Sequence, residues 1–288
     1  MLTNEEIREL KHLHIVAGRK VNEMFAGEYR SAFRGRGMEF DEVRPYVPGD
    51  DIRHIDWNVT ARTNEAHIKI FKEERQLTVV LVVDVSASTR VGSGGRDGRT
   101  DRRLQIARVA GGIAYAGIRN QDRIGLVTFS DRVESYLSPR RTRGHVWSVI
   151  QKVFAGYGRG RETDIAEALR FVHQAQRRRA VVVLISDFLD PGPWADVLGS
   201  LTRRHKVHAI AIHDPLDEGL ARLGLMNVID AETGRRRVVH GRYFSARESL
   251  ESRLDILRRS GASAVAIATG DDAFHVLHQH FRREGLRR

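Results

Sequence analysis

The chain has 288 residues, and 48 Lys and Arg against 37 Asp and Glu give it a net charge of +11. It contains no cysteine, which excludes a disulfide framework and thiolate chemistry. No apolar stretch approaches the roughly 18 residues of a membrane span, and the acidic start, Met1 to Glu6, is unlike a signal peptide. The composition therefore predicts a cytoplasmic protein with one large α/β domain, or one domain with an appended segment.

Hydrophobic periodicity predicts the elements in chain order. A first helix is expected over about 4–25, and apolar strands alternate with helical patterns after residue 76. The expected strands are 77–84, 123–129, 132–137, 180–186, 206–212 and 263–268, and the expected helices are 102–119, 143–155, 164–178, 193–204, 245–259 and 271–282. This alternation predicts an α/β fold, with a mainly parallel sheet flanked by helices on both faces.

Two parts of the chain fall outside this alternation. Residues 227–239 have the pattern of a β-hairpin that turns at Thr233 and Gly234, so a hairpin at about 226–240 is appended to the sheet. The segment before the first strand carries turn residues and opposite charges. We therefore expect two regions, 1–75 packed on a main domain of 76–288.

The most informative motif is Leu-Val-Val-Asp-Val-Ser-Ala-Ser at residues 81–88. An apolar strand breaks at Asp84, and oxygen-bearing side chains follow at alternate positions. An Asp at the carboxyl end of a buried strand lies where open α/β sheets form their ligand crevices. If the chain loops back, Asp84, Ser86 and Ser88 converge as hard oxygen ligands suited to Mg²⁺ or Mn²⁺. The alternative is a strand followed by a Ser helix cap.

Two later segments bring more oxygen ligands to the same expected crevice. Thr163 or Asp164 opens a helical pattern after a Gly/Arg loop, although an ordinary N-cap accounts for either residue alone. A second apolar strand, 180–186, leads into Asp187, with Asp190 and a Pro-Gly-Pro loop behind it. Two strand-end aspartates and a loop threonine are therefore expected around one crevice.

The set Asp84, Ser86, Ser88, Thr163 and Asp187 resembles, in residue type and order, the metal-ion-dependent adhesion site of von Willebrand factor A domains. The resemblance implies a Rossmann-like fold of von Willebrand A type. It also implies that the three hydroxyls bind the ion directly, and the two carboxylates directly or through water. Magnesium needs about six oxygens, so water or a partner's Asp or Glu completes the shell. The predicted role is therefore recognition of a carboxylate rather than catalysis.

A second resemblance covers about residues 27–75. Residues 30–57 read Arg-Ser-Ala-Phe-Arg-Gly-Arg-Gly-Met-Glu-Phe-Asp-Glu-Val-Arg-Pro-Tyr-Val-Pro-Gly-Asp-Asp-Ile-Arg-His-Ile-Asp-Trp, with Ala61-Arg62 just after them. This resembles the signature of the bacterial domain-of-unknown-function family fifty-eight. That family carries a von Willebrand A-like domain and often accompanies MoxR-type AAA+ ATPases. The resemblance implies an adaptor that works with such an ATPase in the assembly or maturation of other proteins.

Within the signature, opposite charges are expected to form a local ion-pair network with Trp57 as its apolar anchor. The charged residues are Asp50, Asp51, Arg53, Asp56 and Arg62. We expect a structural role for this network, in which it docks the amino-terminal segment on the sheet. Direct contact with a partner is the alternative.

The arginine excess is expected to rim the crevice and to steer an acidic partner surface toward the ion. The rim residues would be Arg90, Arg96, Arg99, Arg102, Arg103, Arg140, Arg141, Arg143, Arg159 and Arg161. Solvated faces of an Arg-rich chain are the alternative. The sequence pI of about 10.4 also keeps nucleic-acid binding open. It is disfavoured because Trp57, Trp147 and Trp194 are scattered and the basic residues do not gather on one element.

Enzymatic functions receive less support. A phosphatase of the haloacid type would need a second Asp where Ser86 stands, and the Gly-rich pieces lack the Gly-Lys-Ser/Thr ending of a phosphate loop. His275 and His278 are spaced to share a metal, but solvated helix positions explain them better. A structural scaffold with an empty metal motif remains a rival to the binding role.

Overall fold

The structure, a computed structural model, describes residues 38–73, 77–90, 102–154, 160, 162–218, 224–229, 235–240 and 249–286. The predicted helix over 4–25 and the predicted turn at Thr233 and Gly234 lie outside these residues. Residues 34–77 form one compact unit, and the described residues from Thr78 onward belong to another. Of the helices in the described ranges, none has both the length and the apolar character needed to traverse a bilayer.

The larger unit is built on a six-stranded sheet with the strand order β10-β7-β6-β3-β4-β5. Its strands are β3 (Thr78–Asp84), β4 (Arg123–Phe129), β5 (Val133–Arg140), β6 (Val181–Ser186), β7 (Lys206–His213) and β10 (Ser263–Ala268). Every neighbouring pair is parallel except β4 and β5, which are antiparallel. The predicted α/β fold with a mainly parallel sheet is therefore confirmed.

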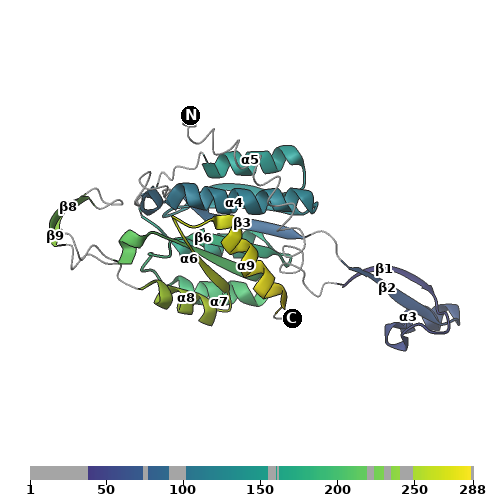
Figure 1. The fold of residues 1–288 in the computed structure, drawn as a ribbon. Helices are drawn as coiled ribbons and strands as arrows, with labels where there is room; N and C mark the ends of the chain where they lie inside the picture. The colour runs from purple at the N-terminus through teal and green to yellow at the C-terminus, as the bar shows by residue number, and fades with distance from the viewer. Residues whose placement is uncertain are drawn as a thin grey trace. The chain divides into compact units, whose positions relative to one another are not determined.

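Helices cover both faces of this sheet, as Figure 1 shows. They are α4 (Arg102–Arg119), α5 (Arg143–Phe154), α6 (Ile165–Ala175), α7 (Trp194–Arg204), α8 (Leu250–Arg259) and α9 (Ala273–Leu286). One core, which includes Val80 and Val82 of β3, joins the sheet to α6, α7 and α8. On the other face α4 packs with α5 and α9, and Gly112 allows the ring of Phe274 to approach because a Cβ there would overlap it.

Burial on both faces explains why β3, β4 and β6 are apolar without alternation. Val79 to Val83 of β3 are at most 2% exposed, and all six residues of β6 are buried. Several predicted boundaries were wrong, including the end of the last helix, which lies at Leu286 rather than 282. Helix α6 ends at Ala175 rather than 178 because the chain must return to β6 at Val181. Strand β5 continues to Arg140 rather than 137 because it pairs with β4 as far as Ile124.

The order in which the chain adds strands to the sheet reverses next to β3. The chain passes from β3 to β4 and β5 on one side, and then returns to β6 on the other side of β3. The carboxyl ends of β3 and β6 are consequently neighbours, with Val83 paired to Ile185. In open α/β sheets such a switch point is the usual place for a ligand crevice.

The smaller unit contains an antiparallel pair, β1 (Met38–Pro45) and β2 (His67–Glu73), that the sequence did not predict. Between them lie the 3₁₀ helix η2 (Ile52–His54) and α3 (Trp57–Thr63). The expected turn is present at Gly49, whose φ of 110° favours glycine.

The expected ion-pair network of the signature was wrong in its details. Separate pairs form instead: Asp51 with Arg53 at 2.7 Å, Asp50 with Arg44 at 2.7 Å, and Asp56 with Lys69 at 3.5 Å. Asp51 and Asp56 also cap the short helices η2 and α3. Trp57 is 71% exposed, so it is not the apolar anchor that was expected.

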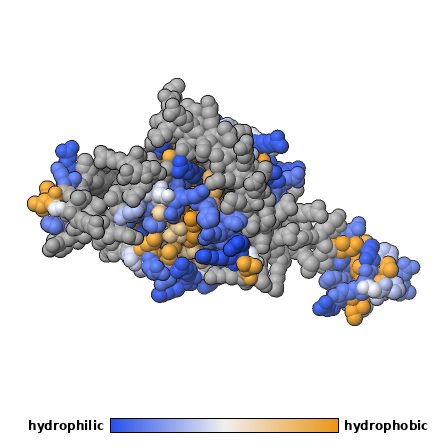
Figure 2. Space-filling view, in the orientation of Figure 1, coloured by the Kyte–Doolittle hydropathy of each residue, from blue (hydrophilic) through white to orange (hydrophobic). Residues whose placement is uncertain are grey.

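The predicted hairpin is present as β8 (Leu225–Ile229) paired antiparallel with β9 (Arg236–His240). These strands form a two-stranded sheet of their own. Leu225 and Val238 are 77% and 68% exposed. Figure 2 shows apolar surface both at the hairpin and on the 38–73 region, where Val47 and Ile52 are also exposed.

Candidate metal centre

Asp84 is the last residue of β3 and is only 1% exposed. The chain leaves the sheet immediately after it, where the Val85 amide donates to the carbonyl of Phe129 at 2.8 Å. One carboxylate oxygen of Asp84, Oδ1, accepts from the Ser86 amide at 2.9 Å. The other, Oδ2, accepts from the Ser186 hydroxyl at 2.6 Å. Asp84 is therefore a buried carboxylate that hydrogen bonds orient on both sides.

The two serines of the motif lie next to each other above this strand end. The 3₁₀ helix η3 (Ala87–Arg90) turns the chain back, and both the amide and the hydroxyl of Thr89 donate to the Ser86 carbonyl, at 3.3 and 2.7 Å. This turn brings the Oγ atoms of Ser86 and Ser88 within 3.0 Å. Asp84, Ser86 and Ser88 therefore converge in the way that the loop-back hypothesis requires.

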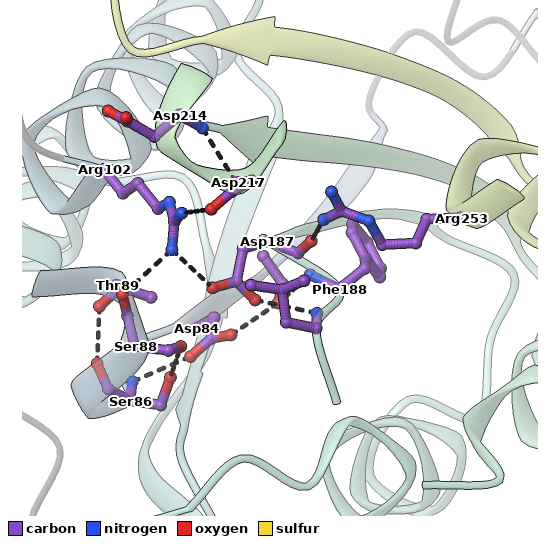
Figure 3. A network of polar contacts seen from close by, with 12 residues as sticks. Asp84, Ser86, Ser88, Thr89, Arg102, Asp187, Phe188, Asp214, Asp217 and Arg253 are labelled. Atoms are coloured by element: carbon purple, nitrogen blue, oxygen red, sulfur yellow. Dashed lines mark hydrogen bonds and ion pairs between the residues drawn. The ribbon is translucent and has the colours of Figure 1, made fainter. Parts of the chain in front are cut away.

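Asp187 follows β6 and is 1% exposed. Its Oδ1 accepts from the Leu189 amide at 3.1 Å, and its Oδ2 lies 3.4 Å from Nη1 of Arg102. Its backbone carbonyl accepts a hydrogen bond from Nη1 of Arg253. Figure 3 shows Asp84, Ser86, Ser88 and Asp187 gathered together, with Arg102 and Arg253 reaching Asp187 from two sides.

Thr163 lies in the turn that leads into α6. Asp164 rather than Thr163 caps this helix, since its Oδ1 accepts from the Glu167 amide at 2.7 Å. The Asp164 amide donates to the carbonyl of Ser130 at 2.9 Å and so ties the turn to the end of β4. Thr163 and Ser88 line one cleft of about 690 Å³, which gives solvent a route to the hydroxyl side of the candidate site.

The second strand-end loop is tied to the same helix. Asp190 accepts from the Ile165 amide at 2.8 Å through Oδ2 and from the Gly192 amide at 2.7 Å through Oδ1. Asp190 thus satisfies an amide at the start of α6 and closes its own Pro-Gly-Pro turn. The two carboxylate oxygens of Asp190 therefore stabilise the wall of the cleft.

Electrostatics make the crevice favourable for a cation. Burial, together with the neighbouring Asp187 carboxylate, raises the pKa of Asp84 to about 7, although hydrogen bonds from Ser186 and Ser86 partly oppose this rise. A positive ion beside Asp84 would stabilise its charged form.

The donor chemistry fits a small hard ion. The candidate ligands offer carboxylate and hydroxyl oxygen only, which suits Mg²⁺ and Mn²⁺. Within the described ranges, no three His, Cys, Asp or Glu side chains gather in a metal-binding arrangement. An ion in this crevice would therefore depend on the hydroxyls of Ser86, Ser88 and Thr163.

The described arginines do not form the expected rim around the crevice. Arg102 is 3% exposed and lies inside the crevice. Arg140 pairs with Ile124 at the amino end of β4, far along the strand from Phe129, which pairs with Asp84. The rim hypothesis failed there because it overlooked that β5 runs antiparallel. The described charged residues that line the cleft are Asp131, Glu162, Asp164, Asp190 and Arg170. Arg96, Arg99, Arg159 and Arg161 lie outside the described residues.

Sequence reasoning missed three residues around the candidate ligands, namely Ser186, Arg253 and Asp217. It placed a fourth, Arg102, on the rim of the crevice rather than inside it. Ser186 had a weak signal, because it is a polar residue at the end of an otherwise apolar strand. Arg253 and Asp217 gave none, since a charged residue in a helix or loop is normally solvated.

The histidines form a pair that was also missed. His208 of β7 is fully buried, and its Nδ1 lies 3.3 Å from Nε2 of His280 on α9. The solvated position expected for His275 is found, since that residue is exposed.

The sequence profile described as "Protein of unknown function DUF58" matches residues 42–257. The chain belongs to the DUF58 family. A relative in Mycobacterium tuberculosis, the uncharacterised protein Rv1480, is 32% identical over 227 residues, which cover 78% of this chain and 70% of the relative. An uncharacterised protein in the moxR 3′ region of Paracoccus denitrificans is 41% identical over 68 residues, or 23% of this chain and 65% of that protein.

Solved structures similar to this DUF58 chain include proteins of von Willebrand A type. BatB from Bacteroides thetaiotaomicron has a TM-score of 0.49 at 13% identity, covering 73% of this chain and 99% of that one. A von Willebrand factor type A protein from Catenulispora acidiphila has a TM-score of 0.42 at 11% identity, covering 76% and 43%. Proximal thread matrix protein 1 of the mussel byssus, with a zinc-occupied MIDAS motif, has a TM-score of 0.44 at 12% identity, covering 72% and 47%.

Proposed function

We propose that this DUF58 chain is a metal-dependent protein-interaction module that binds a carboxylate of a partner protein. The proposed ion is Mg²⁺ or Mn²⁺. The proposed ligands are Asp84, Ser86, Ser88, Thr163 and Asp187. The proposed partner is a MoxR-type AAA+ ATPase, for which the chain acts as an adaptor in protein assembly or maturation. The cytoplasmic location expected from composition is part of this proposal.

One observation supports the metal site most strongly. Asp84 is held in place by the Ser86 amide and the Ser186 hydroxyl, while the hydroxyls of Ser86 and Ser88 lie 3.0 Å apart above it. Asp84 is 1% exposed at a strand end of the kind where open α/β sheets bind ligands, and a bound cation would offset the cost of its buried charge. A Ser helix cap, the simpler explanation, would not require a buried Asp with two fixed oxygens.

The chemistry of the donors favours binding over catalysis. An ion bound here would supply a positive, Lewis-acidic contact point for an external carboxylate. The protein's own residues would orient it: Ser186 fixes Asp84, and the Leu189 amide and Arg102 fix Asp187. Ser88 and Thr163 line the cleft through which the partner's Asp or Glu would enter.

The choice of partner rests on the family. The relative from Paracoccus denitrificans lies in a moxR 3′ region, which supports a functional link between DUF58 proteins and MoxR-type ATPases. Such an ATPase would need an exposed Asp or Glu that fits the cleft beside Ser88.

Equilibrium binding to the MoxR-type ATPase of the same organism tests the proposal. The wild type, Asp84→Asn and Asp255→Asn would be compared in constant Mg²⁺, so that the nucleotide chemistry of the ATPase is unaffected. Asp255 is a matched control, because it is an exposed aspartate on α8 that pairs with Arg258. We expect Asp84→Asn to weaken binding at least tenfold, and Asp255→Asn to leave it unchanged.

Equal affinity of all three proteins would contradict the proposal and would favour a scaffold whose metal motif is empty. Affinity for random duplex DNA that falls steeply with salt, in place of ATPase binding, would point to the nucleic-acid function instead.

A further inference from the structure

Arg102 makes contacts beyond the one by which it orients Asp187 in the proposed function. It begins α4, is 3% exposed, and directs its guanidinium into the crevice between three segments of the chain. Nη1 lies 3.4 Å from Oδ2 of Asp187 and 3.4 Å from the Ser88 carbonyl oxygen, and Nη2 pairs with Asp217. Figure 3 shows the guanidinium between Asp217 and the candidate ligands.

The charge of this group is permanent, because a guanidinium does not lose its proton in proteins. Asp84 and Asp187 are both 1% exposed, so two neighbouring carboxylates are shielded from water. A cation beside them offsets the cost of burying their charge, whether or not a metal ion is bound. Arg102 is a cation that is always present.

Asp217 holds Arg102 in this place. It belongs to η4 (Pro215–Glu218), and its second carboxylate oxygen accepts from the Asp214 amide at 3.1 Å. Asp214 is in turn fixed by the hydroxyl of Thr269, which donates to it at 2.7 Å. The guanidinium is thus shared between a candidate ligand, Asp187, and an anchored carboxylate, Asp217, that is not a candidate ligand.

We propose that Arg102 is the resident counter-ion of the crevice, and that it stabilises the metal-free site and lowers its affinity for the divalent ion. This inference rests on the proposed function, since it concerns the same site. An ion that approaches Asp187 meets the positive charge of Arg102 on the same carboxylate. This repulsion lowers the affinity of the empty crevice for the ion. A partner carboxylate that coordinates the ion adds an attraction, so the ion and the carboxylate reinforce each other's binding when both are present.

The substitution Arg102→Gln tests this proposal, since glutamine keeps a donor but removes the charge. The measurements are the dissociation constant for Mg²⁺ by calorimetry and the melting temperature in EDTA and in saturating Mg²⁺. We expect Arg102→Gln to melt at a lower temperature without metal, to bind Mg²⁺ more tightly, by on the order of tenfold, and to gain more stability from Mg²⁺ than the wild type gains.

Two controls separate charge from packing. Arg102→Lys keeps the charge and should bind Mg²⁺ with an affinity near that of the wild type. Arg103→Gln changes the next residue, whose guanidinium donates to the Phe154 carbonyl at 3.0 Å. It should also leave the affinity unchanged.

A purely structural role for Arg102 predicts the opposite sign, namely weaker Mg²⁺ binding in a folded Arg102→Gln protein, and that result would overturn the inference. If Arg102→Gln does not fold, Asp217→Asn provides the test. It leaves the whole guanidinium charge on Asp187 and should weaken Mg²⁺ binding several-fold, so equal or tighter binding would count against the inference. A wild type that binds no divalent ion would contradict the proposed function itself, which is a different outcome.

Discussion

The crevice at the ends of β3 and β6 and the unit of residues 34–77 both place aspartates against arginines, but in opposite surroundings. In the crevice, the side chains of Arg102 and Asp187 are 4% and 1% exposed. In the smaller unit, those of Arg53 and Asp51 are 85% and 38% exposed. Exposed pairs gain little because water screens and solvates them, whereas a buried charge without its partner is costly. Substitution of an Asp or Arg should therefore change the free energy of unfolding greatly in the crevice and little in the smaller unit.

Apolar side chains show the same contrast. The strands around Asp84 are fully covered by helices, whereas Val47, Ile52 and Trp57 of the smaller unit are more than half exposed. Ile68 is buried in that unit, at 6% exposure. A segment of this size cannot bury much apolar surface by itself, so its local structure depends on helix caps and turns more than on a core.

The largest effect should come from truncating a buried arginine. Arg253 on α8 is 1% exposed and donates to the Asp187 carbonyl. Arg253→Ala should lower the free energy of unfolding by about 3 to 4 kcal/mol, because it empties a packed site and removes that hydrogen bond.

Arg258→Ala is the matched control for this prediction. It lies on the same helix, in an exposed pair with Asp255, and should cost less than about 0.5 kcal/mol. Urea denaturation of both variants measures the difference. Equal losses of unfolding free energy would contradict the contrast between buried and exposed charges.

A buried histidine should give the next effect, as a dependence of stability on pH. Burial lowers the pKa of His205 to about 4, with smaller contributions from Arg204, His173 and Arg179. Its Nδ1 accepts from the Ala180 amide at 3.2 Å. The unfolded chain takes up a proton near pH 6.5, but the native state does not until about pH 4. Stability is therefore full above pH 6.5 and falls between pH 6.5 and 4, by at most about 3 kcal/mol.

The variant His205→Asn isolates this contribution, since its Oδ1 can accept the same hydrogen bond without titrating. Unfolding free energies of the two proteins across pH 4 to 7 should converge at low pH, as the wild type loses stability that the variant keeps. Parallel curves would show that His205 does not titrate as proposed.

Asp84→Asn should change the melting temperature moderately, and the sign of its difference from the wild type should depend on whether metal is present. Asparagine can still accept from the Ser86 amide and face Ser186, and it removes one of two neighbouring buried carboxylates. Without metal we expect a melting temperature equal to or a few degrees above that of the wild type, from about 1 kcal/mol of relieved repulsion. With Mg²⁺ the wild type alone should gain stability. A large loss of stability in EDTA would mean that Asp84 is structural.

The smallest effect is expected in the exposed signature. Arg53→Ala removes a pair with Asp51 that is open to solvent, so the melting temperature should stay within the error of a calorimetric scan. If binding to the ATPase falls while the melting temperature holds, the signature contacts the partner. A clear drop in melting temperature would instead support the docking role first expected of this segment.

The sheet and its helices were predictable because burial on both faces makes β3 and β6 continuous apolar runs, which a single segment of sequence reveals. The convergence of Asp84, Ser86 and Ser88 was also predictable, since it depends on five consecutive residues. The residues that surround these three were not predictable. Arg102 meets Asp187 across 85 residues and Asp217 across 115, and Arg253 meets the Asp187 carbonyl across 66. Local pattern gives no information about such contacts, so the sequence placed Arg102 on the rim of the crevice and did not predict its burial.

Titration of the purified chain with Mn²⁺ by calorimetry, for the wild type, Asp84→Asn and Asp255→Asn, tests the central claim most directly. We predict one bound ion per chain in the wild type and in Asp255→Asn, and none in Asp84→Asn. Absence of binding in the wild type, or equal binding in Asp84→Asn, would contradict the assignment of a metal centre to this crevice.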